Sequence, residues 1–196
     1  MEWRRSIGIQ DDELVVVFLG RLVMEKGLDV FAEAIAALDE REVKYCALVI
    51  GDGPARPWFE QHLPHAIFTG QITGDDLARA LASADVLLNP SITEAFGNVT
   101  LEAMACALPV VAAEATGATN LVRDGITGTL VDASDIDGFA DALEAYARDP
   151  ELRQRHGEAG LAFAKTMDWD RINSIVLRVY RHAIIKRQRL ARMTGK

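Results

Sequence analysis

Short runs of β-branched and other apolar residues alternate along the chain with longer segments whose apolar positions recur every three or four residues. The short runs predict six strands, at residues 14–19, 46–50, 66–69, 86–89, 110–112 and 129–131. The helical period predicts helices at about residues 28–39, 55–62, 75–83, 98–107, 119–123, 136–148, 150–166 and 169–192. Because strands that alternate with helices pair in parallel through right-handed crossovers, this order predicts a doubly wound, Rossmann-like α/β fold.

The length and composition narrow the class of protein. A chain of 196 residues fits one core, and no linker interrupts the alternation, so residues 1–196 are predicted to form a single domain. No apolar run approaches the ~18 residues of a membrane span, and the polar first ten residues do not resemble a secretion signal. These features predict a cytoplasmic protein in which Cys46 and Cys106 are buried, reduced thiols.

The charge of the chain is negative overall but unevenly spread. A formal net charge of -8 argues against a nucleic-acid-binding role, since a phosphate backbone requires a basic surface. No acidic residue follows Asp170, and residues 175–187 combine apolar and cationic positions on a helical period. A basic amphipathic helix is able to lie on the inner face of an anionic membrane, so peripheral membrane contact is one interpretation of this segment. The basic residues after Asp170 are Arg171, Arg178, Arg181, Lys186, Arg187, Arg189, Arg192 and Lys196.

Candidate chemistry lies where the predicted strands end, because doubly wound folds bind ligands at the carboxyl ends of their strands. Glycine follows the first three strands directly, at Gly20, Gly51 and Gly70, and a glycine lets a ligand approach the backbone closely. The loop after the first strand also carries two cations, Arg21 and Lys26, which suit a diphosphate. The alternative for these cations is that they are solvated surface residues.

The loop after the fourth predicted strand carries a carboxylate, Glu94, and a second carboxylate, Glu102, lies in the following helix. Between them, residues 97–99 are predicted to expose the free N–H groups of a helix start, which form an anion site. Carboxylates accept hydrogen bonds strongly, so they suit the hydroxyls of a ribose or a hexose. The alternative is that Glu102 only favours the helix start electrostatically and that Glu94 is a solvated loop residue.

Three strings of residues carry a resemblance to a known family. GRLVMEKG at residues 20–27, GDGP at 51–54 and SITEAFGNVTLEAMACALPVVA at 91–112 resemble the retaining group 1 glycosyltransferases, which have the two-domain GT-B architecture. The resemblance runs from about residue 4 to about residue 181 and implies the C-terminal, donor-binding half of such an enzyme. The family's amino-terminal, acceptor-binding domain has no counterpart in this sequence. The segment 169–196 is then expected to be a terminal helix that packs toward that missing domain.

The resemblance assigns roles to individual residues. It implies that Arg21 and Lys26 bind the donor diphosphate, that Glu94 contacts the hydroxyls of the transferred sugar, and that Glu102 holds the ribose. Glu94, Arg21 and Lys26 are the expected catalytic residues. Ala95 stands where the family often has glycine. The full set expected to contact the nucleotide sugar is Gly20, Arg21, Lys26, Gly51, Gly53, Gln71, Ile72, Glu94, Phe96, Gly97, Asn98, Val99 and Glu102.

The function implied by the resemblance is transfer of a hexose from a nucleoside diphosphate sugar with retention at the anomeric carbon. The frequency of donors in the family favours a UDP-sugar over a GDP-sugar, and no cofactor is expected. The chain alone is expected to be inactive without the acceptor-binding domain. Two alternatives remain open: a nucleotide-sugar-binding module that works with a separate acceptor-binding chain, and a nucleotide-sugar epimerase of the same architecture.

Other motifs are weaker candidates for chemistry. Residues 135–137 and 168–170 match the Asp-x-Asp pattern that holds a metal in some glycosyltransferases, but both lie at predicted helix starts, where aspartate is a favoured cap. The four histidines lack metal-ligand spacing, so no metal site is expected. Gly51 and Gly53 begin a dinucleotide fingerprint, but Arg56 occupies the place of its third glycine, which argues against a nicotinamide cofactor.

Overall fold

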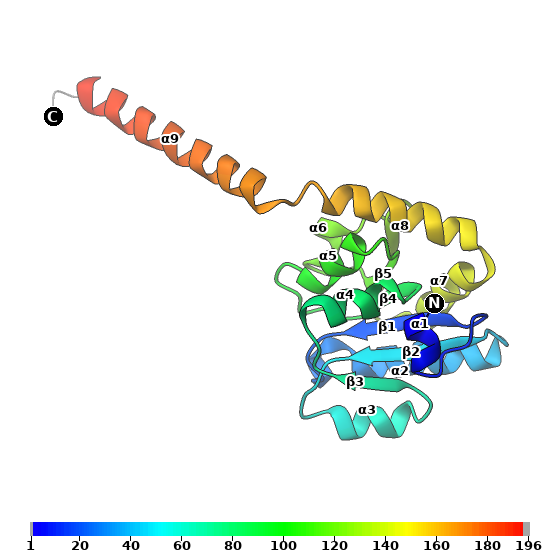
Figure 1. Cartoon of the computed structure of the whole chain (residues 1–196). Coiled ribbons are helices and arrows are strands. Elements are labelled where there is room, and N and C mark those ends of the chain that lie inside the picture. Colours follow the sequence, from blue (N-terminus) through cyan, green and yellow to red (C-terminus); the bar gives the residue numbers. More distant parts are fainter. Residues whose placement is uncertain (1, 194–196) are drawn as a thin grey trace.

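The computed structural model describes residues 2–193, in which six parallel strands form one sheet in the order β3-β2-β1-β4-β5-β6 (Figure 1). The strand order reverses between β1 and β4, which places the topological switch point of the sheet there. This arrangement confirms the predicted doubly wound, Rossmann-like fold. The strands are β1 (Leu14–Leu19), β2 (Tyr45–Ile50), β3 (Ile67–Gly70), β4 (Val86–Asn89), β5 (Val110–Ala113) and β6 (Gly128–Val131).

The helices follow the predicted order, with ends that differ by a few residues from the predicted ones. A short helix at residues 2–6 was not predicted, and the helix after β4 ends at Ala105 because Ala107 adopts a left-handed backbone conformation with φ of 59°. The helices are α1 (Glu2–Ser6), α2 (Leu28–Glu40), α3 (Arg56–His62), α4 (Gly74–Ala82), α5 (Asn98–Ala105), α6 (Ala118–Leu121), α7 (Ile136–Arg148), α8 (Pro150–Ala164) and α9 (Trp169–Met193), with a 3-10 turn η1 at Met24–Lys26.

The core has two layers, one on each face of the sheet. Along β1, Val16 and Phe18 pack into one layer while Val15 and Val17 pack into the other, because successive side chains of a strand point to opposite faces. Phe18 lies edge-on to Phe31, with ring centroids 5.5 Å apart. A strand that is buried on both faces reads as a continuous apolar run, which is why the short apolar runs identified the central strands β1, β2, β4 and β5.

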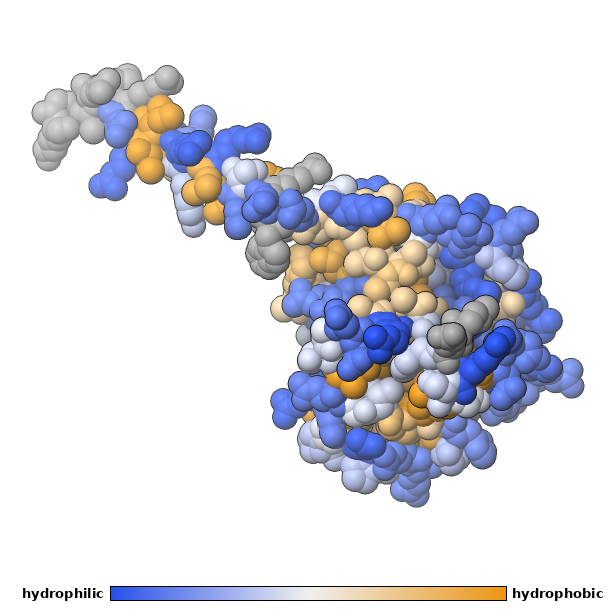
Figure 2. Space-filling model, in the orientation of Figure 1, coloured by the Kyte–Doolittle hydropathy of each residue, from blue (hydrophilic) through white to orange (hydrophobic). Residues whose placement is uncertain are grey.

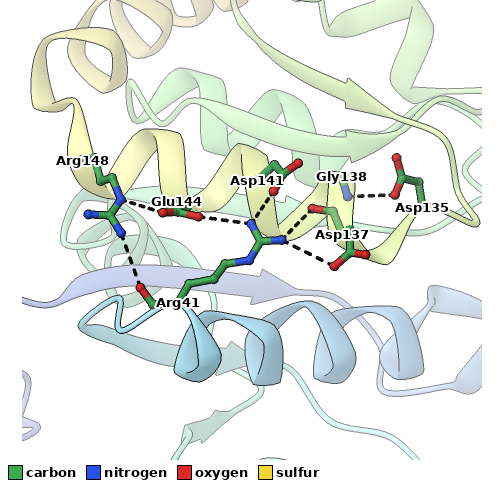
Figure 3. Close-up of polar contacts among 7 residues, drawn as sticks. All are labelled: Arg41, Asp135, Asp137, Gly138, Asp141, Glu144 and Arg148. Carbon is green, nitrogen blue, oxygen red and sulfur yellow. Dashed lines mark hydrogen bonds and ion pairs between the residues drawn. The ribbon is translucent and has the colours of Figure 1, made fainter.

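Helices α2 and α7 lie side by side on one face of the sheet (Figure 3). Arg41, which follows α2, extends over α7, where its Nη1 lies 2.5 Å from Asp141 Oδ1 and 3.3 Å from Glu144 Oε2. Arg148 Nε donates to Glu144 Oε1 at 2.6 Å. These side chains are partly exposed, so each ion pair contributes little free energy alone, and together they fix the end of α2 on α7.

A buried polar contact joins α7 to α8. The Tyr146 hydroxyl lies 2.7 Å from Nδ1 of His156, whose residue is only 8% exposed. Burial lowers the pKa of His156, and the neighbouring Arg155 lowers it further. The imidazole is therefore neutral in the folded protein near neutral pH.

We expect the free energy of unfolding to fall as the pH drops below about 6.5, because the unfolded chain binds a proton at His156 before the folded protein does. Above that pH both states are neutral at this residue and the contribution is constant. Thermal unfolding followed between about pH 7 and pH 5 measures the effect. The loss should be smaller in His156→Phe than in the unmodified chain. Equal slopes for the two proteins would contradict the assignment.

Candidate functional site

Two adjoining cavities lie at the carboxyl ends of the strands, beside the switch point between β1 and β4. One, of about 320 Å³, is lined by the loops after β1 and β4 and by the start of α5. The other, of about 420 Å³, is lined by the ends of β1 and β2 and by the loops after β1, β2 and β3. Leu19, Gly20 and Arg21 line both. A larger cavity of about 740 Å³ lies at the opposite edge of the sheet, among the starts of β2 and β3, and contains none of the predicted residues.

The structure brings most of the predicted residues together in the two adjoining cavities. Gly53 and Glu102 line neither of them. Partial desolvation raises the pKa of Glu102, which lies on α5. The predicted residues that line the cavities are Gly20, Arg21, Lys26, Gly51, Gln71, Ile72, Glu94, Phe96, Gly97, Asn98 and Val99.

The glycines after β2 are required by contact between two loops. A Cβ atom at Gly51 would lie 1.9 Å from the carbonyl oxygen of Gly20, and one at Gly53 would lie 2.4 Å from that of Leu22. The Leu22 amide also donates to the Asp52 carbonyl at 3.0 Å. The group that approaches these glycines closely is therefore the protein's own backbone. These contacts hold the loop after β1, which carries Arg21, against the loop after β2.

Lys26 and Glu94 form an ion pair inside the smaller cavity, with Lys26 Nζ 2.7 Å from Glu94 Oε1. Their side chains are 25% and 15% exposed, so the pair is largely shielded from solvent. Within the described residues, the exposed guanidinium of Arg21 has no ion-pair partner. The cavity therefore presents one free cation and one cation that is shared with a carboxylate.

The predicted anion site falls at the start of α5. Gly97 is the N-cap residue with φ of 91°, a left-handed conformation that favours glycine, and no side chain caps the helix. Asn98 and Val99 follow it in the lining of the smaller cavity. Their backbone N–H groups lie in the first turn, where no intrahelical acceptor is available, so they remain able to bind an anion.

The sequence reasoning missed one buried polar residue of this site. Asn89 ends β4 and lines the smaller cavity, although it is only 7% exposed. Its Nδ2 donates to Thr100 Oγ1 at 3.3 Å, and its Oδ1 accepts from the Ser91 amide at 3.3 Å. A polar residue at the end of an apolar strand was the available signal.

The Asp-x-Asp motifs behave as helix starts where the structure describes them. Asp135 is the N-cap of α7, and its Oδ1 accepts from the Gly138 amide at 2.9 Å (Figure 3). Among residues 2–193, no cluster of three or more His, Cys, Asp or Glu side chains is arranged to hold a metal ion. None of the described helices is both long enough and apolar enough to cross a bilayer.

The sequence profile of the family described as glycosyl transferases group 1 matches residues 13–149. The chain belongs to the group 1 glycosyltransferases. It is 36% identical to a D-inositol 3-phosphate glycosyltransferase of Kribbella flavida over 92% of this chain and 46% of that protein. It thus spans about half the length of the curated relatives that it matches.

Solved GT-B glycosyltransferases share the fold. The structure of Anabaena Alr3699/HepE in complex with UDP-glucose superposes with a TM-score of 0.82 and 25% identity over 92% of this chain and 52% of that one. The C-terminal domain of the group 1 glycosyltransferase LpcC from Francisella tularensis matches with a TM-score of 0.68 and 26% identity, over 79% of this chain and 85% of that domain. The chain therefore corresponds to the C-terminal domain of a GT-B glycosyltransferase.

Proposed function

We propose that this chain is the donor-binding domain of a retaining glycosyltransferase that transfers a hexose from a UDP-sugar. The observation that carries the proposal is the Lys26–Glu94 ion pair, which lies with Arg21 and the start of α5 around one cavity at the switch point. Cations and helix amides suit a diphosphate, and a shielded carboxylate beside them suits sugar hydroxyls. The similar Anabaena structure, which is in complex with UDP-glucose, supports this choice of donor.

The two cavities divide the donor between them in this proposal. The nucleoside occupies the cavity of about 420 Å³, where Gln71 and Ile72 face it. The diphosphate and the sugar occupy the cavity of about 320 Å³. Arg21, Lys26 and the α5 amides stabilise the charge that develops on the diphosphate as the glycosidic bond breaks. Glu94 holds the sugar hydroxyls and positions the anomeric carbon, while the leaving phosphate accepts the proton of the acceptor hydroxyl on the same face. No metal or cofactor takes part.

The acceptor is supplied by another domain in this proposal. Figure 1 shows α9 extending away from the α/β body, and Figure 2 shows apolar and hydrophilic residues alternating along it. Its exposed apolar side chains are Ile175, Val176, Leu177, Val179, Tyr180, Ile184 and Ile185. Exposed apolar residues in this number indicate an interaction surface, which we assign to the acceptor-binding domain. The segment 169–196 includes residues 194–196, which lie outside the described part of the chain.

Nucleotide binding by this chain is the direct test. Thermal unfolding is measured with UDP, GDP, UDP-glucose and GDP-mannose, because a ligand that binds the folded state raises the unfolding temperature. UDP and UDP-glucose are expected to stabilise the chain more than the guanosine ligands. No stabilisation by any of the four would contradict the proposal. Release of an altered sugar without an acceptor would favour an epimerase, and turnover only on addition of a separate acceptor-binding chain would favour a binding module.

The variant Glu94→Gln distinguishes the contribution of the sugar to donor binding from that of the nucleotide. We expect the variant to bind UDP at least as tightly as the unmodified chain, since the diphosphate no longer competes with a carboxylate for Lys26. The additional affinity for UDP-glucose over UDP should fall by about tenfold, because the charge-assisted bonds to sugar hydroxyls are lost. Calorimetric titration with both ligands measures the difference. Glu114→Gln is the matched control, because Glu114 is exposed after β5 and lines neither cavity. Equal losses for both ligands would contradict the role of Glu94.

A further inference from the structure

A chain of hydrogen bonds runs beneath the smaller cavity and is not used by the donor contacts proposed above. It begins at Thr100, which is fully buried in the first turn of α5 and accepts from the Asn89 side chain at 3.3 Å. Asn89 in turn accepts from the amide of Ser91, which is 1% exposed. These contacts join the end of β4 and its following loop to the helix whose amides face the cavity.

The chain of hydrogen bonds continues to the turn that carries Lys26. The Ser91 hydroxyl lies 3.5 Å from Thr93 Oγ1, and the Thr93 hydroxyl donates to the carbonyl oxygen of Glu25 at 3.1 Å. Thr93 directly precedes Glu94, and Glu25 directly precedes Lys26. The Thr93–Glu25 bond and the Lys26–Glu94 ion pair therefore run between the same two segments, one residue apart.

The turn is also pressed against the loop after β4 on its other side. A Cβ atom at Gly27, which has φ of 71°, would lie 3.0 Å from the carbonyl oxygen of Pro90. The backbone of the turn thus contacts Pro90 at one end and the Thr93 hydroxyl near the other.

We propose that Thr93 is a positioning residue, whose hydroxyl holds the η1 turn against the loop after β4 and so fixes Lys26 relative to Glu94 and the α5 amides. This inference rests on the function proposed for the cavity. Groups that bind a diphosphate are most effective when they are held in place before the ligand arrives, and a satisfied polar network supplies that rigidity. Thr93 touches no ligand in this role and acts only through Lys26.

Thr93 is a favourable residue to test because it is exposed. Thr93→Val keeps the shape of the side chain and removes the hydroxyl, whereas Thr93→Ser keeps the hydroxyl. We expect Thr93→Val to weaken UDP binding to this chain by about fivefold, the size of one hydrogen bond, and Thr93→Ser to remain within about twofold of the unmodified chain. Calorimetry with UDP gives the affinities, and the unfolding temperature of each variant shows that the fold is retained.

A double-mutant cycle with Lys26→Met distinguishes positioning from a structural role. If Thr93 acts through Lys26, Thr93→Val has no further effect on UDP affinity once Lys26 is replaced. Additive losses, or equal affinities for the valine and serine variants, would overturn the role of Thr93. Failure of the unmodified chain to bind UDP overturns the proposed function and this inference together, whereas binding that Thr93→Val does not weaken overturns this inference alone.

Discussion

Replacing Lys26 with methionine is expected to weaken UDP binding to this chain by about thirtyfold, which is the range of a charge-assisted hydrogen bond. Two effects act in the same direction. The diphosphate loses a cation, and Glu94, which is 15% exposed and 2.7 Å from Lys26 Nζ, is left as an unpaired carboxylate beside the phosphate. Calorimetric titration with UDP measures the loss, which should shrink as salt is added because screening weakens the contribution of the charge.

A second variant measures the repulsion between the unpaired Glu94 carboxylate and the diphosphate. The double variant Lys26→Met with Glu94→Gln is expected to bind UDP more tightly than Lys26→Met alone, because the unpaired carboxylate is gone. Lys44→Met is the matched control: Lys44 also pairs with a carboxylate, that of Asp12, at 2.6 Å, but it lies at the opposite edge of the sheet. A similar loss in Lys44→Met, or no loss in Lys26→Met, would remove Lys26 from the diphosphate site.

Most of the fold was predictable because the four central strands, β1, β2, β4 and β5, are buried almost throughout and helices α2, α4 and α7 are amphipathic, so these elements have a signal in their own residues. Helix α1 has no such signal. It spans five residues and is held by Arg4, which pairs with Asp85 and donates to the Ser83 carbonyl at 2.7 Å. The partners of Arg4 lie about eighty residues away in the sequence. The spacing of apolar residues within a five-residue helix gives no indication of such a long-range contact.

The candidate site was predictable as a set of positions but not as a set of contacts. The carboxyl ends of parallel strands lie at one edge of a sheet, so the loops that carry Lys26 and Glu94 were expected at the same edge, and the pairing of β1 with β4 brings them together. That the two side chains pair with each other depends on the lengths of both loops and on the η1 turn. The same limit applies to Gly51, where the sequence indicated a close approach but not that the approaching group is the Gly20 carbonyl.

Gly117→Ala is expected to disrupt the site by displacing the backbone of Glu94. Gly117 has φ of 93° and ψ of -58°, a conformation open to glycine alone, and an added Cβ would lie 2.6 Å from the carbonyl oxygen of Glu94 and 2.7 Å from its Cβ. Both the strain and the collision displace Glu94 from Lys26. We expect the unfolding temperature to fall by roughly 10 °C, from about 3 kcal/mol of strain and overpacking, and the affinity for UDP-glucose to fall by about tenfold, as in Glu94→Gln.

A comparison with Gly8→Ala distinguishes the backbone strain from the collision with Glu94. Gly8 has nearly the same φ, 89°, but a Cβ there would meet nothing within 4 Å, so only the backbone term of about 1 kcal/mol remains. This variant should lower the unfolding temperature by about 3 °C and leave UDP-glucose binding unchanged. If Gly117→Ala proves no worse than Gly8→Ala in both measurements, the contact between Gly117 and Glu94 does not hold the carboxylate in place. A loss of UDP-glucose affinity in Gly117→Ala that exceeds its loss of UDP affinity would show instead that the backbone behind Glu94 sets the position of the sugar.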